Sequence, residues 1–220
     1  MTDYRLIRSK RRTLSICVDQ EGALVVRAPM RMPLREIEAF IRQKQDWIAQ
    51  KQQQMGSHAP FVLCDGAQMP FLGGIITLRL ADVRSVKEAN EALLVPKTGD
   101  AYAHVKKWRM QRAKADLPPR VAYWSQRTGL NPAKLSFGNA KKRWGSMNSR
   151  GEMRLNAALM HCPPEMIDYV IVHELCHLLH ANHSPAFHAC VRAVLPQADE
   201  IRKRMQSMGY VTALLDGHSS

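Results

Sequence analysis

The segment around residues 167–178 contains two histidines, His173 and His177, among side chains that are mostly apolar. The apolar residues before the first histidine are Ile167, Tyr169, Val170, Ile171 and Val172. These positions occupy every side of an α-helix, and a helix that is apolar all round is buried inside a protein. The chain must therefore fold around this helix, which holds its histidines in a dry, rigid setting where electrostatic interactions are strong.

His173, Glu174 and His177 form an H-E-x-x-H motif. Residues four apart on an α-helix differ by about 40° around the axis and by roughly one turn along it, so the two imidazoles face one point. Glu174 lies beside that point rather than at it. Two nitrogen ligands with a neighbouring carboxylate suit a catalytic zinc ion, and the glutamate then acts as general base for the metal-activated water.

A catalytic zinc ion usually has three protein ligands and one open position. We expect His183 to be the third ligand, on a tight elbow between two helices. Asn182 tolerates the left-handed conformation that ends helices, and Ser184 and Pro185 suit the start of a new one. The elbow allows His183 to fold back towards the first two histidines.

His180 and His188 are the alternatives to this third ligand. His180 is still on the first helix, and His188 falls inside the next one. If either residue were a fourth protein ligand, the site would be closed. The chain would then be a metal-stabilised interaction module without catalysis.

The cysteine spacing and the lengths of the apolar runs indicate the cellular compartment of the protein. The five cysteines are scattered and form no C-x-x-C pair, so neither a disulfide framework nor a cysteine zinc site is expected. No apolar run reaches the length of a signal peptide or a membrane span. We therefore predict a cytoplasmic protein that does not bind membranes, and its oligomeric state is left open.

The formal net charge of +13 favours anionic partners. Lysines and arginines cluster in the expected helix at 101–128, which presents either a phosphate-binding face or an ordinary solvated one. Nucleic acid is therefore a candidate partner alongside a polypeptide substrate.

The first hundred residues predict mainly short strands, at 12–18, 23–28, 61–64, 74–80 and 92–95, with one helix at 33–51. A hairpin turn is expected at 19–22. The polar segment 96–100 is the clearest linker. We therefore expect a β-rich lobe at 1–100 and a second lobe at 101–220.

The second lobe begins with the helix at 101–128, which the Pro118-Pro119 pair can interrupt. Strands are expected at 134–137 and 154–159, with a hairpin turn at 148–151 directly before the histidine helix. An extended substrate can pair with the edge of such a sheet. Arg143 and Trp144, which lie between the strands, either face that substrate or pack against the helix.

Three stretches, K-K-R-W-G-S-M-N-S-R-G, L-N-A-A-L and P-P-E-M-I-D-Y-V-I-V-H-E-L-C-H-L-L-H-A-N-H-S-P-A-F, resemble the YgjP-like metallopeptidases. More distantly they resemble the SprT-like proteases. The resemblance implies an α+β fold with a zincin-like catalytic lobe, whose active-site helix packs on a small antiparallel sheet. It also implies one Zn²⁺ ion on His173, His177 and His183, with Glu174 as general base. Met147 and His188 depart from the family pattern.

The expected function is that of a zinc-dependent endopeptidase that hydrolyses peptide bonds. Arg143, Tyr169 and Tyr210 are candidates for stabilising the oxyanion. The SprT-like relatives cut proteins crosslinked to DNA, so a DNA-associated protease is the alternative that suits the charge.

Overall fold

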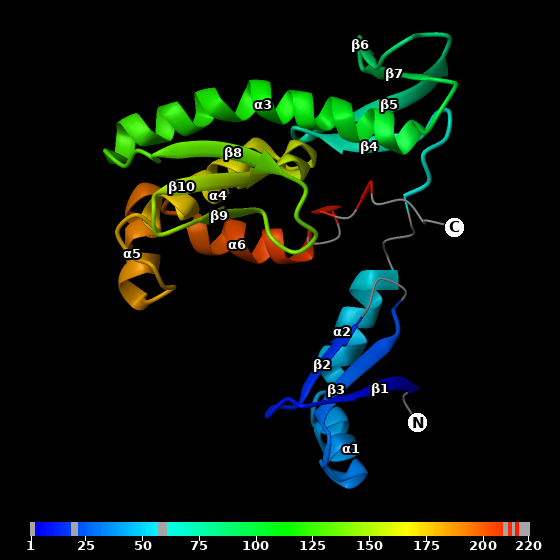
Figure 1. Ribbon diagram of the computed structural model, residues 1–220, viewed down its shortest axis with the longest axis vertical. Coiled ribbons are helices and arrows are strands. Elements are labelled where there is room, and N and C mark those ends of the chain that lie inside the picture. The colour runs from blue at the N-terminus through cyan, green and yellow to red at the C-terminus, as the bar shows by residue number, and fades with distance from the viewer. Residues whose placement is uncertain (1–2, 19–21, 57–60, 209–210, 213, 216–220) are drawn as a thin grey trace. The chain divides into compact units, whose positions relative to one another are not determined.

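The computed structural model describes residues 3–18, 22–56, 61–208, 211–212 and 214–215 (Figure 1). The chain divides into two compact units, Met1–Pro60 and Phe61–Ser220. The division falls at residue 60 rather than in the expected linker at 96–100. The strands before that linker and the helix after it share one core, which keeps them in the same unit.

The first unit is a three-stranded sheet with two helices. Its elements are β1 (Tyr4–Ser9), β2 (Ser15–Val18), β3 (Leu24–Pro29), α1 (Leu34–Gln43) and α2 (Gln45–Gly56). β3 is central, parallel to β1 and antiparallel to β2. Alternate β3 residues Leu24 and Val26 pack with Ile37, Ile41 and Ile48 of the helices.

The prediction of one helix at 33–51 is wrong, because the helix is divided at Lys44 (φ −105°, ψ 13°). Neither glycine nor proline marks this point, so the apolar spacing alone does not reveal it. Pro33 precedes α1 as its N-cap instead of being its first residue. Most of the expected turn at 19–22 lies outside the described residues.

The second unit begins with a four-stranded sheet. Its strands are β4 (Gln68–Phe71), β5 (Gly74–Ala81), β6 (Lys87–Ala89) and β7 (Ala92–Pro96), in the order β4-β5-β7-β6. The sheet packs on α3 (Ala101–Thr128) through Leu78, Leu93, Val105 and Trp108. The predicted strand at 61–64 is absent, because this segment pairs with a side chain: Tyr102 Oη accepts from Leu63 N–H and donates to the Phe61 carbonyl.

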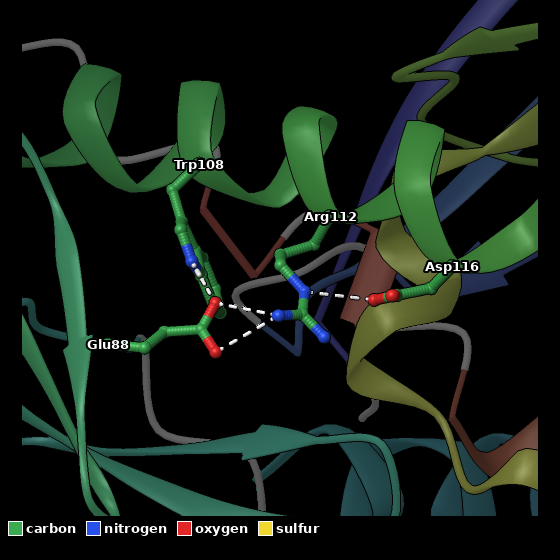
Figure 2. Close-up of polar contacts among 4 residues, drawn as sticks. All are labelled: Glu88, Trp108, Arg112 and Asp116. Atoms are coloured by element: carbon green, nitrogen blue, oxygen red, sulfur yellow. Dashed lines mark hydrogen bonds and ion pairs between the residues drawn. The ribbon is translucent and has the colours of Figure 1, made fainter.

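A carboxylate fastens β6 to α3 (Figure 2). Glu88 accepts a hydrogen bond of 2.8 Å from Trp108 Nε1 and forms an ion pair of 3.1 Å with Arg112. Arg112 also binds Asp116, one turn further along the helix, at 2.9 Å. These contacts hold the start of α3 against the sheet.

α3 runs unbroken through Pro118 and Pro119, so the interruption that the sequence allowed does not occur. Buried Leu117 and Val121 anchor the helix to the core on either side of the prolines. The helix ends at Thr128, and Gly129 follows as its C-cap with a positive φ of 71° that suits glycine.

The second sheet consists of β8 (Lys134–Gly138), β9 (Gly145–Met147) and β10 (Glu152–Asn156), in the order β8-β10-β9. The turn expected at 148–151, with Gly151 at φ 73°, joins β10 to β9, a strand that was not predicted. The sheet is mixed rather than antiparallel, because β10 also pairs in parallel with β8. The strand predicted to continue to residue 159 ends at Asn156, whose side chain caps a 3₁₀-helix (Ala157–His161).

Helix α4 (Pro164–Cys176) lies at the centre of the unit, followed by α5 (Pro185–Val194) and α6 (Ala198–Ser207). It contacts β9, β10, α3, α5 and α6. Ile167, Ile171 and Val172 are fully buried, as the apolar pattern predicts. The expected α+β fold, with this helix packed on a small sheet, is confirmed. No helix in the described part of the chain is long and apolar enough to cross a membrane.

Buried His161, on the 3₁₀-helix after β10, contacts β4 and α3, and its burial predicts a loss of stability in acid. Its Nδ1–H donates to the Pro70 carbonyl at 2.8 Å, and its Nε2 lies 3.4 Å from Arg109 Nη1. Burial, and then the Arg109 charge, lower the pKa of His161 from 6.5 to about 4. Because only the unfolded chain takes up this proton between those values, stability falls as the pH drops from 6.5 towards 4, by about 3 kcal/mol in all.

Urea unfolding of wild type and His161→Gln at pH 7.5 and pH 5 measures this effect. The variant is expected to lose less free energy of unfolding than the wild type over this interval. An equal loss in both proteins would contradict the assignment to His161.

Candidate metal centre

The structure brings together the three histidines that the sequence singles out. His173 lies on α4, His177 directly follows it, and His183 lies in the elbow before α5. Their candidate ligand atoms all lie within 4.8 Å of one another. Nε2 of His173 and Nε2 of His183 are 3.0 Å apart, and the ring centroids of His177 and His183 are separated by 4.8 Å.

Local hydrogen bonds make the elbow. The chain tightens after α4, where the N–H groups of Leu179 and His180 both donate to the Cys176 carbonyl. It restarts at Ser184, whose Oγ accepts from Phe187 N–H at 3.3 Å, with Pro185 in the first turn of α5. The predicted signals for the second helix are therefore the ones the structure uses.

The Phe187 ring packs beneath the three imidazoles, a role that sequence reasoning missed. Its fully buried ring stacks on His177 at 4.5 Å and lies 4.8 Å from His173 and 4.9 Å from His183. Its position four residues after His183, in the first turn of a helix, is the signal that was available. Packing of this ring restricts the rotamers of all three histidines.

His180 and His188, the alternatives to His183 as third ligand, make other contacts. The carbonyl of His180 accepts a hydrogen bond of 2.9 Å from His177 Nδ1–H, which leaves His177 Nε2 free to bind a metal. His188 stacks outside His183, with 6.2 Å between the ring centroids. Neither belongs to the histidine cluster formed by the described residues, so a closed four-ligand site is not favoured.

The donor set fits a zinc ion. Burial, followed by the neighbouring His177 and His183, lowers the pKa of His173 to about 3, so this ring stays neutral at physiological pH. A metal requires neutral imidazoles with free lone pairs, and nitrogen atoms that converge at 3.0 Å meet that need. Three imidazoles and an open fourth position are typical of catalytic zinc.

Glu174 lies beside the cluster and is only 5% exposed. Burial raises the pKa of its carboxyl to about 7, opposed by the charge of Arg143 and by a backbone hydrogen bond from Met147. A Cβ atom on Gly145 would lie 2.7 Å from Oε1 of Glu174. The absence of a side chain at Gly145 therefore lets β9 approach the carboxylate, another feature that sequence reasoning missed.

The remaining candidates occupy different positions. Arg143 is exposed, and its charge acts on Glu174. Trp144 is half-buried and packs against the main core. Tyr169 is buried, with its ring 5.8 Å from that of His173. Tyr210 lies outside the described residues.

One known protein family matches most of the chain. A sequence model described as "YgjP-like, metallopeptidase domain" matches residues 12–208. The chain therefore belongs to the YgjP-like metallopeptidase family, which confirms the resemblance seen in its motifs.

Two solved structures are similar to part of the chain. The crystal structure of the metallopeptidase zymogen of Pyrococcus abyssi abylysin is 24% identical, with 42% of this chain and 93% of that chain covered and a TM-score of 0.39. The metallopeptidase zymogen of Methanocaldococcus jannaschii jannalysin is 22% identical, with 42% and 96% covered and a TM-score of 0.38. No curated protein matches the chain.

Proposed function

We propose that the chain is a zinc-dependent endopeptidase in which His173, His177 and His183 hold the metal and Glu174 is the general base. The observation that carries the proposal is the convergence of three imidazoles beside a buried carboxylate. When bound, zinc supplies Lewis acidity, which makes water more acidic and stabilises negative charge on a carbonyl oxygen.

Glu174 is suited to moving a proton at neutral pH. A general base works best when its pKa lies near the working pH, and burial brings the pKa of this carboxyl to about 7 in the metal-free protein. Its oxygen atoms can therefore accept a proton from water and return it to the leaving amine. The Met147 backbone and the close approach of Gly145 hold the carboxylate in place for both transfers.

The free edge of β9 supports a polypeptide as the substrate. Within the described sheet β9 has a partner, β10, on one side only. Asn156 N–H donates to the Trp144 carbonyl, and Asn148 N–H donates to the Glu152 carbonyl. The backbone groups of Trp144 and Asn148 therefore face β10. The main chain of Gly145 and the Met147 carbonyl are therefore directed to the opposite edge, next to Glu174, where an extended chain can pair. The Met147 N–H already donates to Glu174.

Removal of the metal tests the proposal. The protein with one equivalent of zinc is expected to cleave unfolded casein and a quenched peptide. Dialysis against a chelator should reduce cleavage to the rate without protein, and stoichiometric zinc should restore it. Equal cleavage by the metal-free protein would refute the proposal. Nucleic-acid binding through the basic surface stays a prediction from charge alone.

A further inference from the structure

A hollow of about 400 Å³ lies between the loop that precedes β9 and the sheet β8-β10-β9. The lining residues that matter here are Gly138, Asn139, Arg143, Gly145, Ser146 and Arg154. Gly145 is shared with the candidate active site, because a Cβ atom built on it would lie 2.7 Å from Oε1 of Glu174. The hollow and the candidate active site therefore share strand β9.

Arg154 lies on the face of the sheet that is turned away from α4. Its neighbours on β10, Met153 and Leu155, are fully buried in the core, whereas Arg154 is exposed. The guanidinium lies over Gly138: a Cβ there would be 2.6 Å from Nε and 2.7 Å from Nη2. The absence of a side chain at Gly138 thus makes room for the guanidinium against the sheet.

The hollow is electropositive. It is lined by Arg143 and Arg154 and by no aspartate or glutamate. Among the ion pairs of the described residues, none involves Arg154. Behind the lining, Arg109 is 1% exposed and donates from Nη2 to Asn139 Oδ1 at 3.0 Å. A buried cation is poorly screened, so it adds to the potential in the hollow.

The loop that closes the hollow is held in place. Asn156 is 3% exposed, and its Nδ2 donates to the carbonyls of Ala140 at 2.6 Å and Arg143 at 2.8 Å. These two bonds fix the backbone that carries the Arg143 side chain. The hollow is therefore organised before a ligand enters.

We propose that the hollow binds a carboxylate of the polypeptide substrate through Arg143 and Arg154, which favours cleavage near an acidic group. This inference rests on the proposed peptidase function. In a strand paired with β9, alternate side chains lie on the Ser146 face, which is the face of Arg154. The carboxylate is supplied either by an aspartate or glutamate side chain or by the end of the substrate chain.

Matched peptides test the proposal. Quenched peptides with blocked ends carry glutamate or glutamine at successive positions around the scissile bond, and a third set has a free C-terminal carboxylate. The wild type is expected to cleave the best carboxylate peptide with a kcat/KM about 10-fold or more above its neutral match, as a charge-assisted hydrogen bond predicts. The set that shows the preference identifies the source of the carboxylate.

Two substitutions change the hollow in different ways. Arg154→Gln removes the charge. It is expected to bring the ratio of kcat/KM between the carboxylate peptide and its neutral match close to one. Gly138→Ala keeps the charge but displaces the guanidinium, and it should lower the ratio as well. Arg150→Gln, in the β9–β10 turn outside the lining, is the matched control and should retain the wild-type ratio. A wild type without preference, or an unchanged ratio in Arg154→Gln, would overturn the proposal.

A binding measurement separates this inference from the proposed function. Fluorescence anisotropy of labelled peptides on Glu174→Gln, which is not expected to cleave them, should show tighter binding of the carboxylate peptide. When Arg154→Gln is combined with Glu174→Gln in one double variant, the two peptides should bind with equal affinity. If the wild type cleaves no peptide, the peptidase proposal fails while the binding ratio still decides the role of the hollow.

Discussion

Replacement of Glu174 by glutamine is expected to lower kcat for peptide cleavage by on the order of 10² to 10⁴-fold while zinc remains bound. Glutamine has a similar shape but cannot accept a proton from water, and the three histidines are unchanged. Initial rates on a quenched peptide, together with zinc content by atomic absorption, measure both parts of the expectation.

Glu165→Gln is the matched control for this substitution. Glu165 is on the same helix, but it is exposed and pairs with Arg204 on the surface. This variant should keep both the cleavage rate and the zinc. If Glu174→Gln cleaves at the wild-type rate, the base must be another group.

Replacement of His183 by alanine is expected to weaken zinc binding by more than about 100-fold, since loss of a ligand should exceed the effect of losing a group that merely orients one. His183 is exposed in the elbow, so the core around α4 should stay folded. Competition with a chromophoric chelator measures the affinity, and the thermal unfolding midpoint of the metal-free proteins checks the fold.

His188→Ala is the control that distinguishes His183 from His188 as the third ligand. His188 stacks on His183 but lies outside the histidine cluster. The control should bind zinc nearly as tightly as the wild type. If instead it loses zinc while His183→Ala retains it, the assignment of His183 is wrong.

Local patterns account for the parts of the fold that were predicted well. The apolar residues on every side of α4 indicate a buried helix, and Ser184 and Pro185 mark the start of α5. The β9–β10 turn at Gly151 is specified by nearby residues in the same way. Each of these features depends on contacts within a few positions along the chain.

Other parts depended on partners distant in sequence. The predicted strand at 61–64 is instead tied to Tyr102, and β10 pairs with β8 as well as with β9. The division between the units at residue 60 reflects the common core of the four-stranded sheet and α3. Because these contacts join segments far apart in the chain, spacing and propensity do not reveal them.

The candidate metal centre also divides into features set by local sequence and features set by contacts between distant segments. The sequence alone determined that His173 and His177 share one side of a buried helix and that a turn returns His183 to them, because helix geometry and capping act locally. Only the tertiary structure placed Phe187 beneath the rings, Gly145 against Glu174, and Arg154 over Gly138. Those three contacts require packing between separate elements, and the space that each glycine leaves is visible only once its neighbour is in place.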